Sequence, residues 1–156
     1  MNTQFFSKSE IMARFSSRQR GAGTAREEAG LALATLIMAS ALFGKKTWDG
    51  EDYVDHPIAV GMRNTRSTTK KIIGILHDVV EDTTDEPDPW TLEDLKHLGF
   101  SPRVVSGVDH VTRREGEPYF DFIVRCGGGG DDLSLIHISV PTRRTPISYA
   151  VFCLKK

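Results

Sequence analysis

The sequence predicts an all-α protein, and three features support this prediction. Apolar residues recur at intervals of three and four positions, the period of an α-helix, most clearly from Ile72 to Thr83. Residues that favour a helix start, among them Asp55, Thr91 and Ser101, precede several apolar stretches. The alternating apolar and polar pattern of a β-strand does not occur before Arg125.

Composition indicates one globular domain with a buried core, because 39% of the 156 residues are hydrophobic. The formal net charge of −1 produces no strong field toward nucleic acid or an anionic membrane, so we expect neither partner. The two cysteines, Cys126 and Cys153, form no disulfide framework and no metal-binding motif. We therefore expect a reducing, cytoplasmic environment.

The first part of the chain divides into an arm and a helix. Residues 1–23 are mostly polar, with arginines, serines and two glycines, so we expect a flexible N-terminal arm in which the apolar residues between Phe5 and Phe15 could form one or two amphipathic turns. Thr24 can then cap a helix that runs through Phe43 and ends at Gly44. This helix is too short to span a bilayer and starts late for a secretory signal, so we favour a buried core helix.

A polar loop and a second helix follow. The loop, from Lys45 to Asp52, contains glycine and is expected at the surface. Asp55 can cap a helix with Pro57 in its first turn, where the missing N–H of proline costs nothing. His56 lies at this helix start, and by itself a histidine in such a place is usually structural.

The segment Ile72–Thr83 is apolar at first and ionisable at its end, and we predict one continuous helix surrounded by core. Residues four apart share a helix face, so His77 lies over Glu81 and Asp78 lies over Asp82. Burying such groups is costly unless a partner is present. A divalent cation such as manganese, iron or zinc is a suitable partner because imidazole and carboxylate groups both ligate it.

The remaining elements are short. Residues 84–89 form an acidic, proline-containing loop, which we interpret as a solvated connector rather than a second cation site. Helices are predicted to start near Thr91, Ser101 and Glu117. Four glycines after Cys126 end the last of them.

The motifs of the central segment resemble those of a known family. The doublet His77-Asp78 is similar to that of the HD-domain metal-dependent phosphohydrolases. The longer string His77-Asp78-Val79-Val80-Glu81-Asp82-Thr83 resembles the RelA/SpoT-type domain, which hydrolyses the alarmone (p)ppGpp, and Tyr53-Val54-Asp55-His56-Pro57 resembles another segment of that domain. The resemblance extends from about Ala39 to Arg125.

The resemblance implies an HD-domain helical bundle that binds a divalent metal, preferably Mn²⁺, through His56, His77 and Asp78. It implies catalytic roles for Glu81 and Asp82, which would orient or deprotonate the attacking water and assist the leaving group. The expected partner is a small-molecule nucleotide pyrophosphate. The expected reaction is release of the 3′-pyrophosphate from guanosine-3′,5′-bis(diphosphate).

The candidate substrate-binding residues are Lys45, Lys46 and Trp48 of the polar loop, together with Tyr53. In the related hydrolases the equivalent loop reaches over the nucleotide, so the lysines are candidates for phosphate contacts and the tryptophan for a base contact. A solvated loop that its tryptophan anchors to the domain explains the same residues equally well. Both interpretations stay open.

The resemblance ends after Cys126. Residues 127–156 contain the glycine run and then resemble the translation of a sequencing adapter, so we expect a non-native tail. We accordingly expect a C-terminally truncated HD-type domain over residues 24–126. The family's remaining metal ligand, an aspartate on a later helix, has no counterpart, and we expect weak metal binding and little activity.

Two further positions depart from the family pattern. Leu42 stands where relatives usually carry a histidine, and Thr47 stands where the alarmone hydrolases place a base-stacking arginine. An alternative function is therefore a degenerate HD domain that binds nucleotide as a regulatory module without catalysis, and an inactive fragment is a third interpretation. The sequence makes no prediction of the oligomeric state.

Overall fold

The computed structural model describes residues 6–16, 24–47, 50–63, 67–114 and 116–127. All extended regular elements within these ranges are helices, and an isolated bridge between Lys46 and Asp52 is the one strand-like pairing recorded there. The predicted all-α fold class is thus confirmed. In chain order the helices are α1 (Lys8–Phe15), α2 (Thr24–Leu42), α3 (Asp55–Arg63), α4 (Thr68–Leu76), α5 (Val79–Asp82), α6 (Leu92–His97), α7 (Pro102–Val111) and α8 (Tyr119–Gly127).

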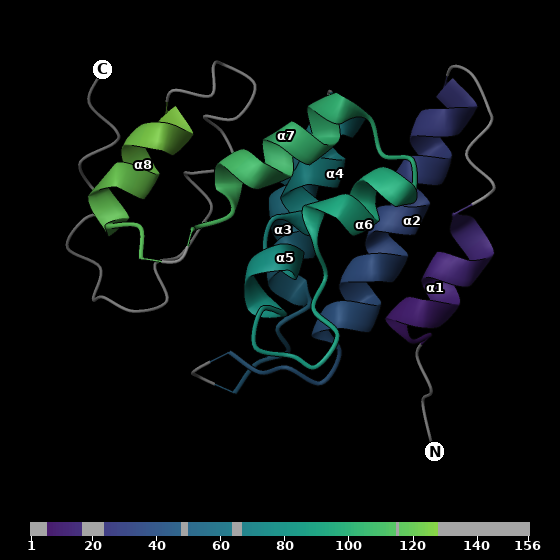
Figure 1. Cartoon of the computed structure of the whole chain (residues 1–156), viewed down its shortest axis with the longest axis horizontal. Coiled ribbons are helices and arrows are strands. Elements are labelled where there is room, and N and C mark those ends of the chain that lie inside the picture. Colours follow the sequence, from purple (N-terminus) through teal and green to yellow (C-terminus); the bar gives the residue numbers. More distant parts are fainter. Residues whose placement is uncertain (1–5, 17–23, 48–49, 64–66, 115, 128–156) are drawn as a thin grey trace.

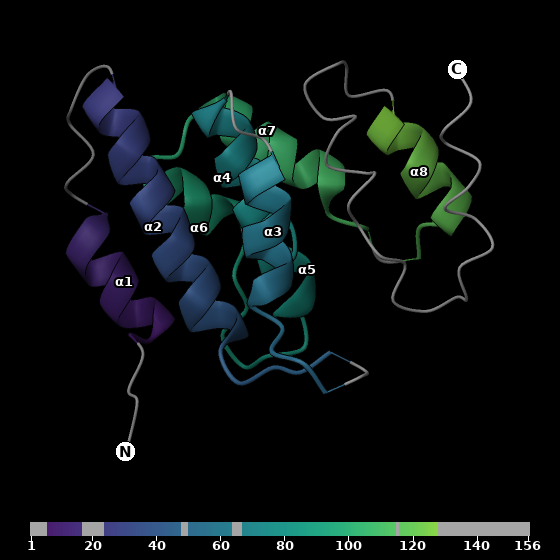
Figure 2. The ribbon, with the colours of Figure 1, turned by 180° about the vertical axis from the view of Figure 1, so that it is seen from behind.

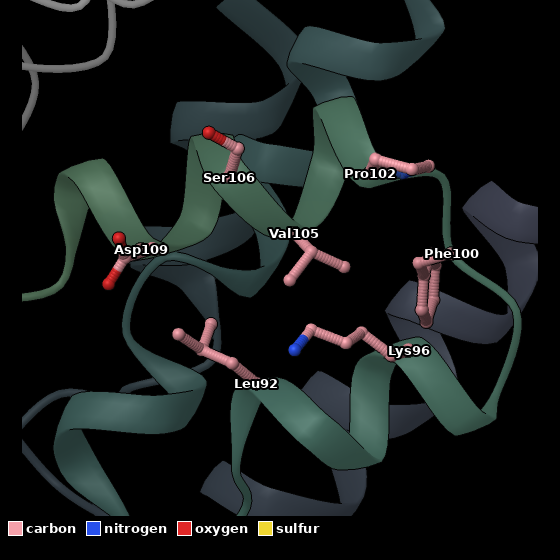
Figure 3. A pocket seen from close by; sticks show the side chains of 7 residues that line it. All are labelled: Leu92, Lys96, Phe100, Pro102, Val105, Ser106 and Asp109. Atoms are coloured by element: carbon pink, nitrogen blue, oxygen red, sulfur yellow. The ribbon is translucent and has the colours of Figure 1, made fainter.

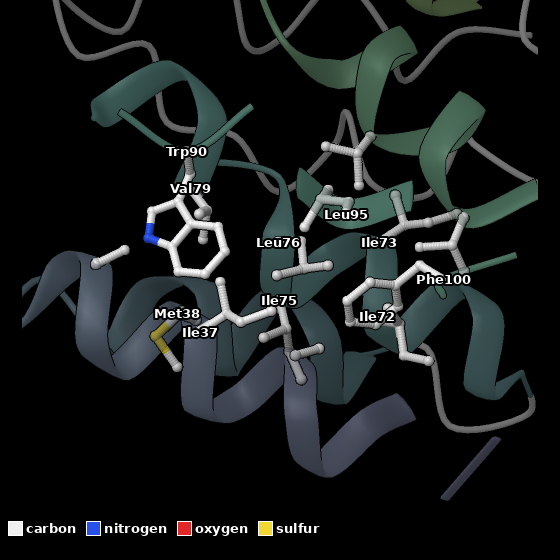
Figure 4. Packing of buried hydrophobic residues seen from close by; sticks show 14 of the residues in the cluster. Ile37, Met38, Ile72, Ile73, Ile75, Leu76, Val79, Trp90, Leu95 and Phe100 are labelled. Atoms are coloured by element: carbon white, nitrogen blue, oxygen red, sulfur yellow. The ribbon is translucent and has the colours of Figure 1, made fainter. Parts of the chain in front are cut away.

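Helix α4 is the centre of the bundle and packs against α2, α3 and α7 (Figure 1). Its N-terminus is capped by the Ser67 hydroxyl, which accepts from the Lys70 amide. Every residue from Ile72 to Leu76 is buried. Their side chains meet apolar groups of the neighbouring helices and of the loop carrying Trp90 (Figure 4). Burial of each large aliphatic side chain contributes about 1.5–3 kcal/mol, so this short helix anchors the fold.

Helices α3 and α4 approach each other through two glycines. A Cβ on Gly74 would lie 3.0 Å from the Gly61 Cα, and a Cβ on Gly61 would lie 2.6 Å from the Ile75 Cγ1. The two backbones are therefore in direct contact, which larger residues would prevent. This contact brings the start of α3 next to the end of α4.

The predicted continuous helix over 72–83 is interrupted. Helix α4 ends at Leu76, His77 and Asp78 form a turn, and α5 begins at Val79. Both turn residues keep right-handed helical φ angles, −58° for His77 and −91° for Asp78, but the ψ of Asp78 is −12°. The chain direction therefore changes slightly where the ionisable residues begin.

The predicted caps of α6 and α7 are confirmed. Thr91 and Asp94 form a reciprocal capping box at the start of α6, and the Ser101 hydroxyl accepts from the Val104 amide at the start of α7. No helix within the described residues is long and apolar enough to cross a membrane.

Helix α8 lies at the side of the bundle, beyond the end of α7 (Figure 1). Its Arg125 guanidinium binds the Glu117 carboxylate with two hydrogen bonds of 2.7 Å and donates to the carbonyls of Asp109, His110 and Thr112. One half-buried arginine thus satisfies carbonyls at the C-terminus of α7 and fastens α8 to it.

Part of the predicted flexible arm over residues 1–23 differs from that expectation. Residues Lys8–Phe15 form helix α1, which lies along α2 (Figure 2). Ser7 and Glu10 form a capping box, and the Ile11 side chain is fully buried. The Lys8 ammonium also reaches Asp88 at 3.0 Å and Asp94 at 2.9 Å. A capped start and an apolar face allow these residues to join the bundle, so the folded unit begins before residue 24.

We predict that Ile11→Ala lowers the free energy of unfolding by about 2–4 kcal/mol, because it leaves a cavity between α1 and α2. Chemical denaturation followed by circular dichroism measures this change. Ser9→Ala, at an exposed position of the same helix, is the control and should change stability by less than about 0.5 kcal/mol. Equal stability of Ile11→Ala and the wild type would mean that α1 is not docked.

Candidate metal centre

Three residues predicted as metal ligands meet at one place. His56 lies in the first turn of α3, and His77 and Asp78 form the turn after α4. One ligand atom from each, a ring nitrogen or a carboxylate oxygen, lies within 4.8 Å of the other two. Residues more than twenty positions apart are therefore assembled into a group that could hold a metal ion.

The contacts within this group are close. The His77 Nε2 lies 3.0 Å from the Asp78 Oδ1, and the His56 Nε2 lies 3.7 Å from the Asp78 Oδ2. The centroids of the two imidazole rings are 5.2 Å apart. The side chains of His56 and Asp78 keep 19% and 13% of their surface exposed, whereas that of His77 keeps 1%. The group therefore opens to solvent on the side of His56 and Asp78.

Backbone geometry determines the tautomer of His77. Its Nδ1 lies 2.8 Å from the Gly74 carbonyl oxygen, which can only accept, so Nδ1 carries the proton. Burial lowers the pKa of His77 to about 4, so the ring is neutral at pH 7 and Nε2 carries an unprotonated lone pair. Nε2 is buried and has no hydrogen-bond partner among the described residues. Such an orphaned nitrogen is costly unless something binds it.

Two carboxyl groups at the site have raised pKa values. Burial raises the pKa of Asp78 to about 7, and the Glu81 carboxylate adds to the shift while His56 opposes it. Burial also raises the pKa of Asp82 to about 7, with Asp78 and Glu81 adding to the shift and Lys45 opposing it. Burial lowers the pKa of His56, and Asp78 partly offsets this effect. Without a cation, the buried acids thus retain protons near neutral pH.

The two predicted catalytic acids lie on α5, directly after the turn that carries two of the candidate ligands, and they differ in exposure. Asp82 ends α5, and its amide donates to the Asp78 carbonyl at 2.8 Å, so α5 continues directly from the turn. Glu81 is exposed, and its carboxylate accepts from the Arg113 amide at 3.2 Å. Arg113 lies just after α7 and was not a predicted contact.

The predicted substrate-binding residues have different environments. The Tyr53 hydroxyl is buried and donates to the Asp78 Oδ2. Lys45 donates to the Asp82 carbonyl and pairs with Glu86 at 2.6 Å. Lys46 is exposed and pairs with Asp52. Trp48 lies outside the described residues.

A pocket of about 560 Å³ lies between α6 and α7 (Figure 3). The residues that line it include Leu92, Lys96, Phe100, Val105 and Asp109. None of the predicted site residues lines this pocket, so it is separate from the metal centre.

The residues present fit a divalent cation. Atoms that ligate one ion at about 2.0–2.2 Å cannot lie much more than about twice that length apart, and the three candidate atoms nearly satisfy this limit without an ion. Two neutral imidazoles and one carboxylate are a donor set suited to manganese, iron or zinc. The Gly74 carbonyl orients His77 in the manner of the outer partners of metal-binding histidines. The contact between Gly61 and Gly74 was not predicted from the sequence. A glycine in each of the two helices is the sequence signal that could have indicated it.

No model of a known protein family and no curated protein matches this chain.

We predict that Asp78→Asn becomes more stable relative to the wild type as the pH rises from about 4 to about 7 in metal-free buffer. The pKa of Asp78 is about 7 in the folded protein and near 3.8 in the unfolded chain. The folded state thus holds a proton that the unfolded state has released, and rising pH disfavours the wild-type fold. The full difference amounts to a few kcal/mol, at about 1.4 kcal/mol per pKa unit.

Denaturant unfolding at several pH values, with a chelator present, measures this effect. The carboxylate of Asp78 also acts on the pKa values of His56 and Asp82, so the comparison reports the titration of this whole group and not of Asp78 alone. Asp85→Asn, at an exposed position, is the matched control and should show no such trend. A stability difference between Asp78→Asn and the wild type that stays constant over this pH range would contradict the prediction.

Proposed function

We propose that this protein is a metal-dependent phosphohydrolase of the HD superfamily that acts on a nucleotide pyrophosphate, with Mn²⁺ as the preferred ion and the cytoplasm as its location. The observation that carries the proposal is the contact between His77 and Asp78. The Nε2 lone pair faces a carboxyl oxygen of Asp78 at 3.0 Å. Two acceptor atoms at this distance need either a proton between them, which Asp78 partly retains near neutral pH when no ion is bound, or a cation that both atoms bind.

His56, His77 and Asp78 would hold the ion, which supplies Lewis-acid polarisation of a phosphoryl group and acidifies a neighbouring water. Asp82, with its pKa raised to about 7, can take up and release a proton near neutral pH. The position of the Glu81 carboxylate is set by the Arg113 amide, which suits a role in orienting a water or substrate group. The sequence resemblance to (p)ppGpp hydrolases supplies the substrate class, with the 3′-pyrophosphate as the leaving group.

A second candidate function is nucleotide binding without turnover. Leu42, at the position where relatives carry a histidine, is completely buried in the core. Thr47 replaces the base-stacking arginine of the alarmone hydrolases, and Lys45 is engaged by Asp82 and Glu86 rather than pointing freely to solvent. These features favour a regulatory module with an incomplete catalytic apparatus.

We predict that the full chain binds Mn²⁺ weakly and releases pyrophosphate slowly from guanosine-3′,5′-bis(diphosphate). Activity should stop when a chelator removes the ion and should be lost in His77→Gln, because Nε2 is a proposed ligand. Isothermal titration with Mn²⁺ and a colorimetric pyrophosphate assay measure the two effects. His97→Gln, at an exposed position of α6, is the matched control and should retain both.

The outcomes separate the candidate functions. Nucleotide binding with no pyrophosphate release would favour the regulatory module. Equal release by the wild type, His77→Gln and the chelated protein would contradict a metal-dependent hydrolase, as would a wild type that binds no Mn²⁺ at millimolar concentration. A tight one-to-one Mn²⁺ site would contradict the expected weakness.

A further inference from the structure

We propose that Tyr53 is a positioning residue of the metal centre, whose hydroxyl holds Asp78 so that the carboxylate presents Oδ1 to the ion. This inference rests on the proposed metal centre. Tyr53 Oη donates to the Asp78 Oδ2, while Oδ1 faces the His77 Nε2 at 3.0 Å. Oδ2 also lies 3.7 Å from the His56 Nε2, so the oxygen that the phenol holds faces the second imidazole. The phenol thus fixes the rotation of the carboxylate that places Oδ1 against His77.

The phenol is held firmly enough for this role. Tyr53 is 3% exposed, and its backbone amide donates to the Lys45 carbonyl at 3.1 Å. Its own carbonyl accepts from the His56 amide at 3.2 Å, and the two rings are 6.2 Å apart. Tyr53 therefore links the loop before α3 to two candidate ligands, His56 through the backbone and Asp78 through the side chain.

The same loop also holds the far end of α5. Lys45 Nζ donates to the Asp82 carbonyl, the last residue of that helix, and pairs with Glu86 just beyond it. Asp78 immediately precedes α5, so the loop from Lys45 to Tyr53 contacts the chain before and after this four-residue helix. A helix so short has little stability of its own. These two contacts therefore add to the packing of Val79 in the core, which also holds this helix and Asp78 in place.

A purely structural role for the hydroxyl is the competing explanation, because buried tyrosines usually find some acceptor. The two roles differ in their consequences for a bound ion. Loss of a structural hydrogen bond lowers stability and leaves the ligand field of a bound ion unchanged. Loss of a positioning contact alters the affinity and the spectrum of the ion, since outer partners of metal ligands typically contribute about 10–100-fold to affinity.

We expect Tyr53→Phe in the full chain to raise the Kd for Mn²⁺ by about 10–100-fold. The visible absorption spectrum of the Co²⁺ form should shift at saturating Co²⁺, which a structural role would not produce. Tyr119→Phe removes a hydroxyl from α8 and is the matched control, with unchanged Kd and spectrum. Circular dichroism of the metal-free proteins confirms that each variant is folded.

Each result decides between the proposals. Wild-type binding of Mn²⁺ with the same Kd and the same Co²⁺ spectrum in Tyr53→Phe would overturn the role of Tyr53 and leave the metal centre intact. Absence of Mn²⁺ and Co²⁺ binding in the wild type would overturn both. Should Tyr53→Phe not fold, the near-ultraviolet difference spectrum on Mn²⁺ binding of the double variant Tyr119→Phe, Tyr149→Phe gives the answer, because Tyr53 is then the one remaining tyrosine. A tyrosine band supports the proposal, and its absence contradicts it.

Discussion

The structure depends on a buried imidazole placed at the end of the most buried helix. Gly74 connects this imidazole to the fold in two ways. Its missing side chain allows the α3 backbone to approach at Gly61, and its carbonyl accepts the His77 Nδ1 proton. The first contact places His56 beside His77, and the second turns the Nε2 lone pair toward Asp78. The packing of α3 on α4 and the geometry of the centre therefore have a common origin.

A near-neutral chain concentrates negative groups at this point. Asp78, Glu81 and Asp82 lie within five residues, whereas the formal charge of the whole protein is only −1. Asp78 and Asp82 are partly buried while Glu81 is exposed, and burying two carboxylates without a partner is normally costly. Protons partly relieve the repulsion, as the raised pKa values of Asp78 and Asp82 indicate. A cation would replace those protons, so metal binding and proton release are coupled equilibria.

Much of the fold could be predicted because its signals are local. Periodic apolar residues and capping residues such as Thr91 and Ser101 identify α6 and α7 directly. The docking of α1 could not be predicted with the same certainty, since Ile11 and Lys8 take on their roles only when α2 and the loop around Asp88 are present. In the candidate site, His77 and Asp78 are adjacent in sequence and His56 is marked by Pro57. Tyr53 and Lys45 could be singled out as candidate substrate contacts, but their hydrogen bonds to Asp78 and Asp82 are tertiary and leave no pattern in the sequence.

The break in the central helix follows from the demands of the site itself. Successive residues of a regular helix point in directions about 100° apart and do not face a common point. A continuous helix over 72–83 is thus hard to reconcile with two adjacent side chains that face a common point. The turn at His77 and Asp78, with a ψ of −12° at Asp78, relaxes this conflict and brings Nε2 and Oδ1 to 3.0 Å. The predicted alignment of His77 with Glu81 on one helix face therefore describes the site less well than the contact between His77 and Asp78 in the turn. The helix is therefore interrupted at the two adjacent residues whose side chains face each other.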